Sequence, residues 1–339
     1  MPKVLLHEHL DGGLRPATLL ELLRERGLPS PASDVAGLTA WLHANAHAGS
    51  LMKYLEGFAL TVAAMARPEA MSRVAYEAAE DAAAEGAVLA EFRIAPLLFE
   101  AHGVPGDVAV EALLDGLRRS SLPCGLIVCA MRQLPPEATV RAAELAIRFQ
   151  GRGVIGFDLA GPERGFPPQL HARALAIAQG AGLPLTLHAG EADSAERVLE
   201  AGRLGARRIG HGVRLIDALE NPAGAGLLAE ARALGLHLEV CPTSNVHTGA
   251  ASSVAAHPIT ALWRNGVSLS YHTDNRLVSC ISHSAEAAAL LTQTDLTEAD
   301  LLEMGLHAAR ASFLPAQTRQ AAEEALRAYA RQRALTLRH

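Results

Sequence analysis

The stretch Val4–His9, VLLHEH, joins an apolar run to two histidines that are two residues apart. A short apolar run of this kind is typical of a strand that is buried on both faces of a sheet. Because side chains two apart on a strand point to the same side, His7 and His9 are expected to point together into the interior where the strand ends. The stretch therefore predicts a buried parallel strand that ends in a pair of potential metal ligands.

Similar runs rich in Val, Ile and Leu recur along the chain between alanine-rich helical stretches. This alternation is typical of repeated βα units and therefore of a parallel sheet. Eight such strands predict a closed (β/α)8 TIM barrel of the α/β class. The expected strands are Val4–His9, Ala87–Ile94, Gly125–Met131, Val154–Leu159, Leu183–His188, Arg207–His211, His237–Cys241 and Val267–Thr273.

An open doubly wound sheet would show the same alternation of strands and helices. That fold usually holds a dinucleotide on a G-x-G-x-x-G loop after an early strand, and this chain has no such loop there. We therefore favour the barrel and interpret residues 1–339 as a single domain. An insertion at about residues 14–85 separates the first two strands and is a candidate lid. Its expected helices are Pro16–Arg26, Leu38–Ala48 and Met71–Glu85, and Ala321–Arg333 is expected to be a closing helix.

Composition points to a small-molecule enzyme with a large core. Half of the residues are hydrophobic and 19% are charged, which fits a sheet buried on both faces. The net charge of −6 comes without a basic block, so neither nucleic acid nor an anionic membrane is an expected partner. The sequence shows no signal segment or membrane span, and its four cysteines lack C-x-x-C spacing, so we expect a reduced, cytoplasmic protein. It gives no indication of oligomeric state.

Further polar residues are expected at the carboxyl ends of other strands, where barrel enzymes place their catalytic groups. His188 occurs in TLHAGE, His211 in RIGHG and Asp274 in YHTDN. Three imidazoles and one carboxylate around an open position suit a Zn²⁺ ion that activates a water. We therefore predict one zinc per chain, and its ligands are His7, His9, His188 and Asp274. Glu191 follows His188 by three residues and is the expected proton carrier.

The order of these motifs resembles the adenosine deaminase family along nearly the whole chain. The resemblance is carried by HEHLDG from His7, AEFRIAP from Ala90, FDLAG from Phe157, HAGE from His188, RIGHG from Arg208, CPTSN from Cys241, and TD from Thr273. It implies a hydrolase that replaces the amino group of a 6-aminopurine nucleoside with oxygen. Adenosine or 2′-deoxyadenosine would give inosine or 2′-deoxyinosine and ammonia.

The resemblance also implies roles for single residues. Glu191 would donate a proton to purine N1, and His211 would orient and stabilise the attacking hydroxide. Asp274 would accept a hydrogen bond from that water in addition to binding zinc, and His9 is assigned to both the metal and the substrate. The remaining substrate contacts would be the Gly161 N–H with N3, Asp11 with the ribose 5′-hydroxyl and Asn275 with N7.

Asn275 departs from the family pattern, in which most relatives have a second aspartate at this point. A carboxamide donates to N7 without first acquiring a proton, whereas a carboxylate must be protonated to do so. We therefore expect weaker pH dependence of substrate binding. Asp158 and Glu239, which are polar residues in apolar strands, are interpreted either as partners of the ligand histidines or as structural hydrogen-bonding groups. Asp11 has an alternative reading as a loop-capping residue.

The sequence is compatible with several other functions. A binuclear amidohydrolase is disfavoured because the only lysines, Lys3 and Lys53, do not end strands, and a cytidine-type deaminase is excluded by the lack of C-x-x-C. Adenine, 6-aminodeoxyfutalosine or an N6-methylated nucleotide would use the same chemistry, and Arg15 or Arg276 would be candidates to contact a charged substituent. A catalytically silent metal-binding barrel is the alternative from another class.

Histidines without ligand-like spacing, including His171 and His283, are expected at the surface or in loops, and Glu8 is expected to need an arginine partner.

Overall fold

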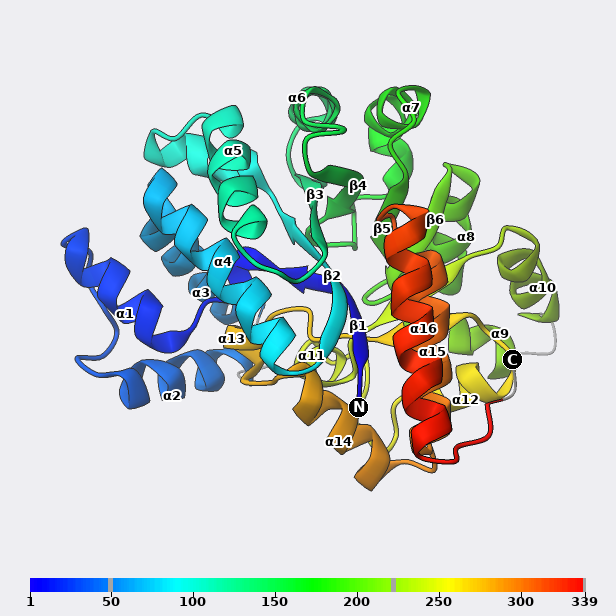
Figure 1. The fold of residues 1–339 in the computed structure, drawn as a ribbon. Coiled ribbons are helices and arrows are strands. Elements are labelled where there is room, and N and C mark those ends of the chain that lie inside the picture. Colours follow the sequence, from blue (N-terminus) through cyan, green and yellow to red (C-terminus); the bar gives the residue numbers. More distant parts are fainter. Residues whose placement is uncertain (48–50, 221–223, 338–339) are drawn as a thin grey trace.

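The computed structural model describes residues 1–47, 51–220 and 224–337. Its centre is a single sheet of eight parallel strands in the order β1 to β8, with helices between them, which confirms the predicted (β/α)8 barrel (Figure 1). Each strand overlaps its expected segment. The strands are β1 Lys3–His9, β2 Ala87–Ile94, β3 Cys124–Met131, β4 Val154–Ala160, β5 Leu185–Ala189, β6 Ala206–His211, β7 His237–Val240 and β8 Leu269–Tyr271.

The barrel closes between its first and last strands through residues that follow β8. An isolated parallel bridge joins Glu8 to Asp274. In this bridge the His9 N–H donates to the Asp274 carbonyl at 2.8 Å, and the Asp274 N–H donates to the His7 carbonyl at 3.0 Å. The seam of the barrel is therefore built from the same residues that were predicted to bind the metal.

Helices cover the outside of the barrel between successive strands (Figure 1). The last two, α15 and α16, pack against each other, and Leu302 and Leu326 share a buried cluster with Leu6 of β1. The predicted closing helix is confirmed as part of α16. The helices after β2 are α5 Gly106–Arg118, α6 Pro136–Arg148, α7 Ala172–Gly180, α8 Ala195–Arg203, α9 Asp217–Glu220, α10 Ala225–Ala233, α11 Pro242–His247, α12 Ile259–Arg264, α13 Arg276–Ser279, α14 His283–Gln293, α15 Glu298–Ala311 and α16 Ala316–Gln332.

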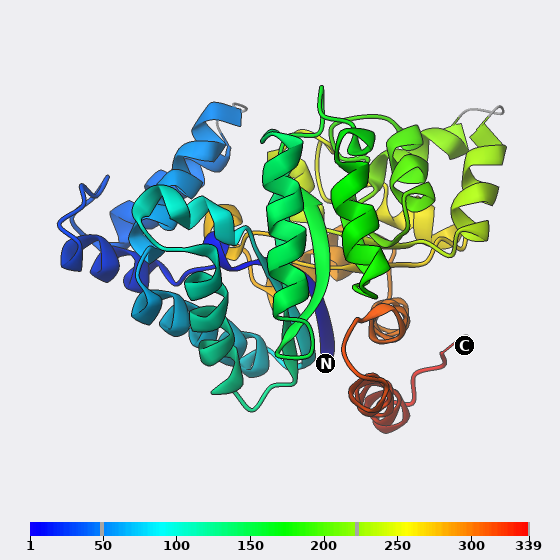
Figure 2. The same cartoon turned by 90° about the horizontal axis from the view of Figure 1, so that it is seen from above.

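The insertion between β1 and β2 is helical, as predicted, and contains α1 Pro16–Glu25, α2 Val35–Ala46, α3 Leu51–Met65 and α4 Pro68–Ala84. Figures 1 and 2 both show α1 and α2 to one side of the barrel. Asp34 caps α2 by accepting from the Gly37 N–H, so this helix begins before Leu38, and the expected end at Ala48 lies outside the described residues. The helix α3 was not predicted. The lid role and the domain limits stay predictions.

Two histidines contradict the expectation of a surface or loop position. His171 and His283 are both buried. The His283 ring lies 3.1 Å through Nε2 from the Tyr271 carbonyl, and the His171 ring lies 2.9 Å from the Arg132 carbonyl. Each ring is therefore a hydrogen-bonded packing residue, which sequence spacing does not reveal.

No helix in the described part of the chain is long and apolar enough to span a membrane.

Candidate active site

Five predicted site residues face one point at the carboxyl end of the barrel. Single ligand atoms of His7, His188, His211 and Asp274 all lie within 4.8 Å of one another. His9 joins this group, because its Nε2 lies 3.2 Å from Nε2 of His188 and 3.5 Å from Oδ1 of Asp274. The side chains come from β1, β5, β6 and the segment after β8, so closure of the barrel is what brings them together.

Buried carboxylates orient two of the histidines. His7 Nδ1 lies 2.8 Å from Glu239 Oε2, and His188 Nδ1 lies 3.1 Å from Asp158 Oδ1. A ring nitrogen that faces a carboxylate carries the proton, so the lone pair of each neutral ring is on Nε2 and points to the common centre. Asp158 and Glu239 are therefore partners of the candidate ligands.

The residues around this centre fit a divalent cation. His7 Nε2 is buried and has no hydrogen-bond partner among the described residues, although Asp274 Oδ1 lies 3.2 Å away. A lone pair and a carboxylate oxygen at this distance repel each other unless a positive charge lies between them. Burial lowers the pKa of His9 well below its ordinary value, which favours the neutral form that binds metals. Imidazole nitrogen and carboxylate oxygen are also the ligands that Zn²⁺ uses.

A network of buried charges lies beneath the centre. Arg93 donates to Glu239 Oε2 at 2.6 Å and to Asp158 Oδ2 at 2.9 Å, and Arg208 contacts Glu239 Oε1 at 2.6 Å. Burial alone would raise the pKa of Asp158, but His188 and Arg93 hold that pKa below its ordinary value. Burial acts in the same direction on Glu239, and Arg93 and Arg208 reverse it. Both carboxylates are thus kept ionised to orient the histidines.

Glu191 lies on the open side of the centre. Its Oε1 accepts hydrogen bonds from Asn245 Nδ2 at 3.0 Å and from Thr248 Oγ1 at 2.7 Å, and its Oε2 lies 3.6 Å from His211 Nε2. The Asn245 amide also lies 3.1 Å from His211 Nδ1. Asn245 and Thr248 were not predicted as site residues. Asn245 belongs to the CPTSN motif that begins at Cys241.

Backbone strain occurs at two of the five residues. His211 and Asp274 have φ angles of 66° and 59°, in the left-handed region that non-glycine residues rarely adopt. The surrounding structure holds such a conformation at a cost of about 1–3 kcal/mol, and it is common at functional sites. Ser244 fixes the Asp274 side chain by donating to its Oδ2 at 2.6 Å.

The residues predicted to contact substrate follow β1, β4 and β8. Asp11 is buried, its Oδ1 has no hydrogen-bond partner among the described residues, and burial raises its pKa to about 7. A Cβ atom at Gly12 would lie 2.0 Å from Asn275 Oδ1, so a residue with a side chain does not fit at this position unless Asn275 moves. Gly161 has a φ of 98°, and a Cβ there would lie 2.3 Å from Gln133 Oε1. Gly12 is thus favoured by the neighbouring side chain of Asn275, and Gly161 by its own backbone conformation.

The expected arginine partner of Glu8 is Arg276, whose Nε donates to Glu8 Oε1 at 2.7 Å. Arg276 also donates to Asp81 Oδ2 at 3.2 Å and to the Gly13 carbonyl at 3.0 Å. Arg15 is similarly paired, since its Nε donates to Asp81 Oδ2 at 3.0 Å. Both arginines are therefore engaged in ion pairs: Arg276 joins the insertion to the barrel, and Arg15 pairs within the insertion.

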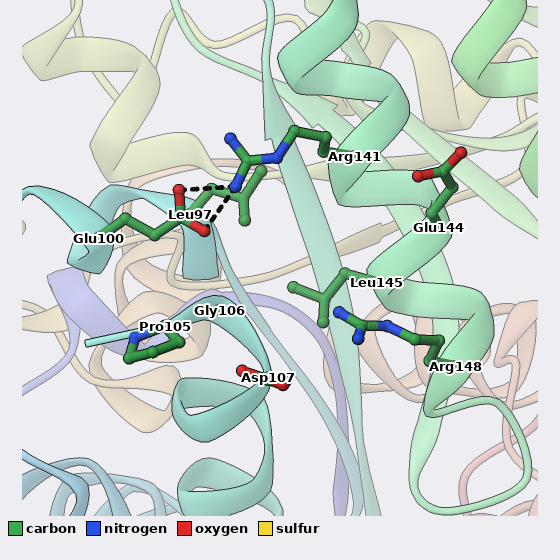
Figure 3. A pocket seen from close by; sticks show the side chains of 9 residues that line it. All are labelled: Leu97, Glu100, Pro105, Gly106, Asp107, Arg141, Glu144, Leu145 and Arg148. Carbon is green, nitrogen blue, oxygen red and sulfur yellow. Dashed lines mark hydrogen bonds and ion pairs between the residues drawn. The ribbon is translucent and has the colours of Figure 1, made fainter. Parts of the chain in front are cut away.

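A cavity of about 430 Å³ lies away from this site, between η2 (Pro96–His102), α5 and α6. Figure 3 shows that its lining carries both signs of charge, with Arg141 paired to Glu100 at 2.7 Å. Asp107, Glu144 and Arg148 are the other charged residues around it. The mixed charges select no particular ligand, and none of these residues belongs to the cluster in the barrel.

Comparison with known proteins agrees with this geometry. The family model described as Adenosine deaminase matches residues 2–329. An adenosine deaminase of Mycobacterium tuberculosis is 41% identical, with 94% of this chain and 92% of the relative covered. An adenosine deaminase of Mycobacterium sp. strain KMS is 42% identical with the same coverage.

Solved structures agree in fold over almost the entire chain. The N6-mAMP deaminase of Arabidopsis is 25% identical, has a TM-score of 0.83, and covers 97% of this chain and 98% of its own. An amidohydrolase from Burkholderia ambifaria, solved with bound Zn, is 26% identical with a TM-score of 0.85 and covers 98% of this chain and 92% of its own. The described barrel, its histidine and carboxylate cluster and these matches together show that the chain belongs to the adenosine deaminase family and is a hydrolytic deaminase.

Proposed function

We propose that the protein is a zinc-dependent enzyme that hydrolyses adenosine or 2′-deoxyadenosine to inosine or 2′-deoxyinosine and ammonia. The observation that carries this proposal is the convergence of His7, His9, His188 and Asp274 on one point beside Glu191. The identity of 41% to a mycobacterial adenosine deaminase supports the choice of a nucleoside.

One zinc ion per chain would be held by His7, His9, His188 and Asp274. When bound, zinc lowers the pKa of a water molecule so that it can attack at neutral pH. The candidate ligands are preorganised for the metal, because Glu239 and Asp158 direct the Nε2 lone pairs of His7 and His188 to the centre.

The proposed proton transfer depends on Glu191. Asn245 and Thr248 both donate to Oε1 and so leave Oε2 on the side of His211. In this role Glu191 delivers a proton to purine N1 and makes C6 more electrophilic, while His211 orients the attacking oxygen. The Gly161 N–H and the Asn275 amide would bind N3 and N7.

The charges around the sugar side favour a nucleoside over a nucleotide. A phosphate needs a cation or several N–H donors, yet Arg15 and Arg276 are held in ion pairs with Asp81 and Glu8. Asp11 is buried and would repel a phosphate in its ionised form, whereas it can accept a hydrogen bond from a sugar hydroxyl. Free adenine would leave Asp11 without that partner, and 6-aminodeoxyfutalosine remains the other alternative.

An ultraviolet assay with adenosine, 2′-deoxyadenosine, adenine, 6-aminodeoxyfutalosine and N6-methyl-AMP tests the proposal, together with metal analysis. We expect the highest kcat/KM on the two nucleosides, one zinc per chain, and loss of activity on chelation. Glu191→Gln should lower kcat by about 10²–10⁴-fold, the usual contribution of a general acid, while Glu144→Gln on α6 should have no effect. Preference for the nucleotide or the base would refute the substrate, and activity on none would favour the silent barrel. The cytoplasmic location stays a prediction.

A further inference from the structure

The carboxylate of Glu163 accepts four backbone hydrogen bonds from one loop. Its Oε1 accepts from the Gly190 N–H at 2.6 Å, and its Oε2 accepts from the N–H groups of Glu191, Ala192 and Asp193 at 3.0, 2.8 and 3.1 Å. Glu163 is only 7% exposed. These four residues connect β5 to α8, and the second of them is the proposed proton donor.

The chemistry of this contact requires an ionised carboxylate. Both oxygens of Glu163 accept at once, which an amide or a protonated carboxyl group cannot do without turning a donor toward an N–H group. Hydrogen bonds to an ionised group are also stronger than those between neutral groups. The bonds therefore define the conformation of the loop, which includes Gly190 with a φ of 66°.

The next residue holds the same loop from its other side, since Arg164 Nε donates to the Ala192 carbonyl at 2.6 Å. The segment after β4 thus binds both N–H and C=O groups of the segment after β5. Glu191 is fixed twice, at its backbone by Glu163 and at its carboxylate by Asn245 and Thr248. Small shifts in the backbone would be enough to move the carboxylate away from these donors.

We propose that Glu163 is a positioning residue for the deamination, acting through the loop that carries Glu191. This inference rests on the proposed role of Glu191. Because Gly161 lies two residues before Glu163, the same short segment would set both the purine N3 contact and the position of the proton donor. Glu163 itself has its two oxygens occupied by the loop and does not act on the purine.

The first test is Glu163→Gln in the full-length zinc enzyme, with Glu144→Gln as the matched control. We expect kcat to fall by about 10–100-fold, because misplacing a catalytic group by about 1 Å has costs of this size, while KM changes by less than about threefold. Zinc content should be unchanged. Glu163→Asp keeps the charge and should retain more activity than Glu163→Gln.

Two further readouts separate positioning from general destabilisation. Hydrogen exchange should become faster at the amides of residues 190–193 in Glu163→Gln, with the rest of the barrel unchanged. In single-turnover kinetics, Glu163→Gln should reduce the rate by less than about twofold when Glu191→Gln is already present, because neighbours that act through one group are not additive. The proposal would be overturned by unchanged hydrogen exchange in the loop or by faster exchange throughout the barrel. It would also be overturned if Glu163→Gln reduced the single-turnover rate equally in the wild type and in Glu191→Gln. A wild-type enzyme that is inactive on adenosine would instead refute the proposed substrate, and the exchange result would still test the loop contact.

Discussion

Arg276 Nε lies 2.7 Å from Glu8 Oε1 in an ion pair that links β1 to α13, and in this pair Glu8 is buried and Arg276 is partly exposed. The other carboxylate oxygen of Glu8 accepts from Thr273 Oγ1 at 2.8 Å. Burial raises the pKa of Glu8, and Arg276 opposes that rise. The pair lies behind His7 and His9, on the outward side of the strand, and so supports the site without taking part in it.

Arg276→Met should destabilise the protein by about 3–5 kcal/mol, because it leaves Glu8 as an uncompensated buried charge. Urea unfolding at neutral pH measures this free energy. Glu8→Gln combined with Arg276→Met removes both charges and should recover most of the loss. A cost below about 1 kcal/mol would mean that the pair behaves like an exposed surface salt bridge.

Glu286 on α14 should give the protein a pH-dependent stability. Burial raises its pKa from 4.5 to about 7, and its Oε1 accepts from the Thr243 N–H at 3.1 Å. Since the folded pKa exceeds the unfolded one, the stabilising contribution is complete below about pH 4.5 and is lost as the pH rises through about 7. This pKa difference corresponds to about 3 kcal/mol.

Glu286→Gln, which cannot ionise, should therefore gain stability relative to the wild type between pH 5 and pH 8. Thermal or urea unfolding of the two proteins across this range measures the difference. The gain should level off once the pH exceeds the pKa of Glu286. Parallel stability curves would show that Glu286 ionises as easily in the folded protein as in the unfolded chain.

Gly12→Ala should impair substrate binding, because its Cβ would lie 2.0 Å from Asn275 Oδ1 and must displace that side chain. We expect KM to rise by about tenfold, equivalent to the loss of about 1.4 kcal/mol in binding. Gly226→Ala on α10 is a suitable control, since a Cβ there meets no atom within 4 Å. That control should leave KM unchanged, and equal KM values for all three proteins would contradict the predicted role of Asn275.

Asn275→Asp should introduce a pH dependence into KM that the wild type lacks. A carboxylate binds purine N7 only while it is protonated, so KM should rise as the pH increases through the pKa of the new group. Steady-state kinetics on adenosine from pH 5 to pH 9 tests this, with kcat followed separately. Indistinguishable KM profiles would show that Asn275 does not donate to N7.

The strands and the candidate metal ligands were predictable because short stretches of sequence indicate them. An apolar run followed by a histidine, as at His7 and His188, marks both a strand and its carboxyl end. The helix α3 was missed because its sequence, LMKYLEGFALTVAAM, has few polar residues to mark an outward face. Local signals thus identified the barrel better than the insertion.

Contacts between distant loops could not be predicted in the same way. Glu163 binds backbone N–H groups that any residue would present at positions 190–193, so the partner residues leave no trace in the sequence. Asn245 and Thr248 contact Glu191 because the barrel brings α11, which follows β7, next to the loop that follows β5. Their roles come from the closed barrel rather than from residue type or spacing.

The seam between Glu8 and Asp274 has a consequence for how the protein is made. During synthesis, the histidines of β1 leave the ribosome long before residue 274 does, and the barrel cannot close until that residue arrives. A chain that stops before this point keeps open strand edges, which invite pairing with other chains. It also lacks the aspartate that faces His7 and His9. Completion of the barrel and the onset of metal binding should therefore coincide, so that unfinished chains are inert.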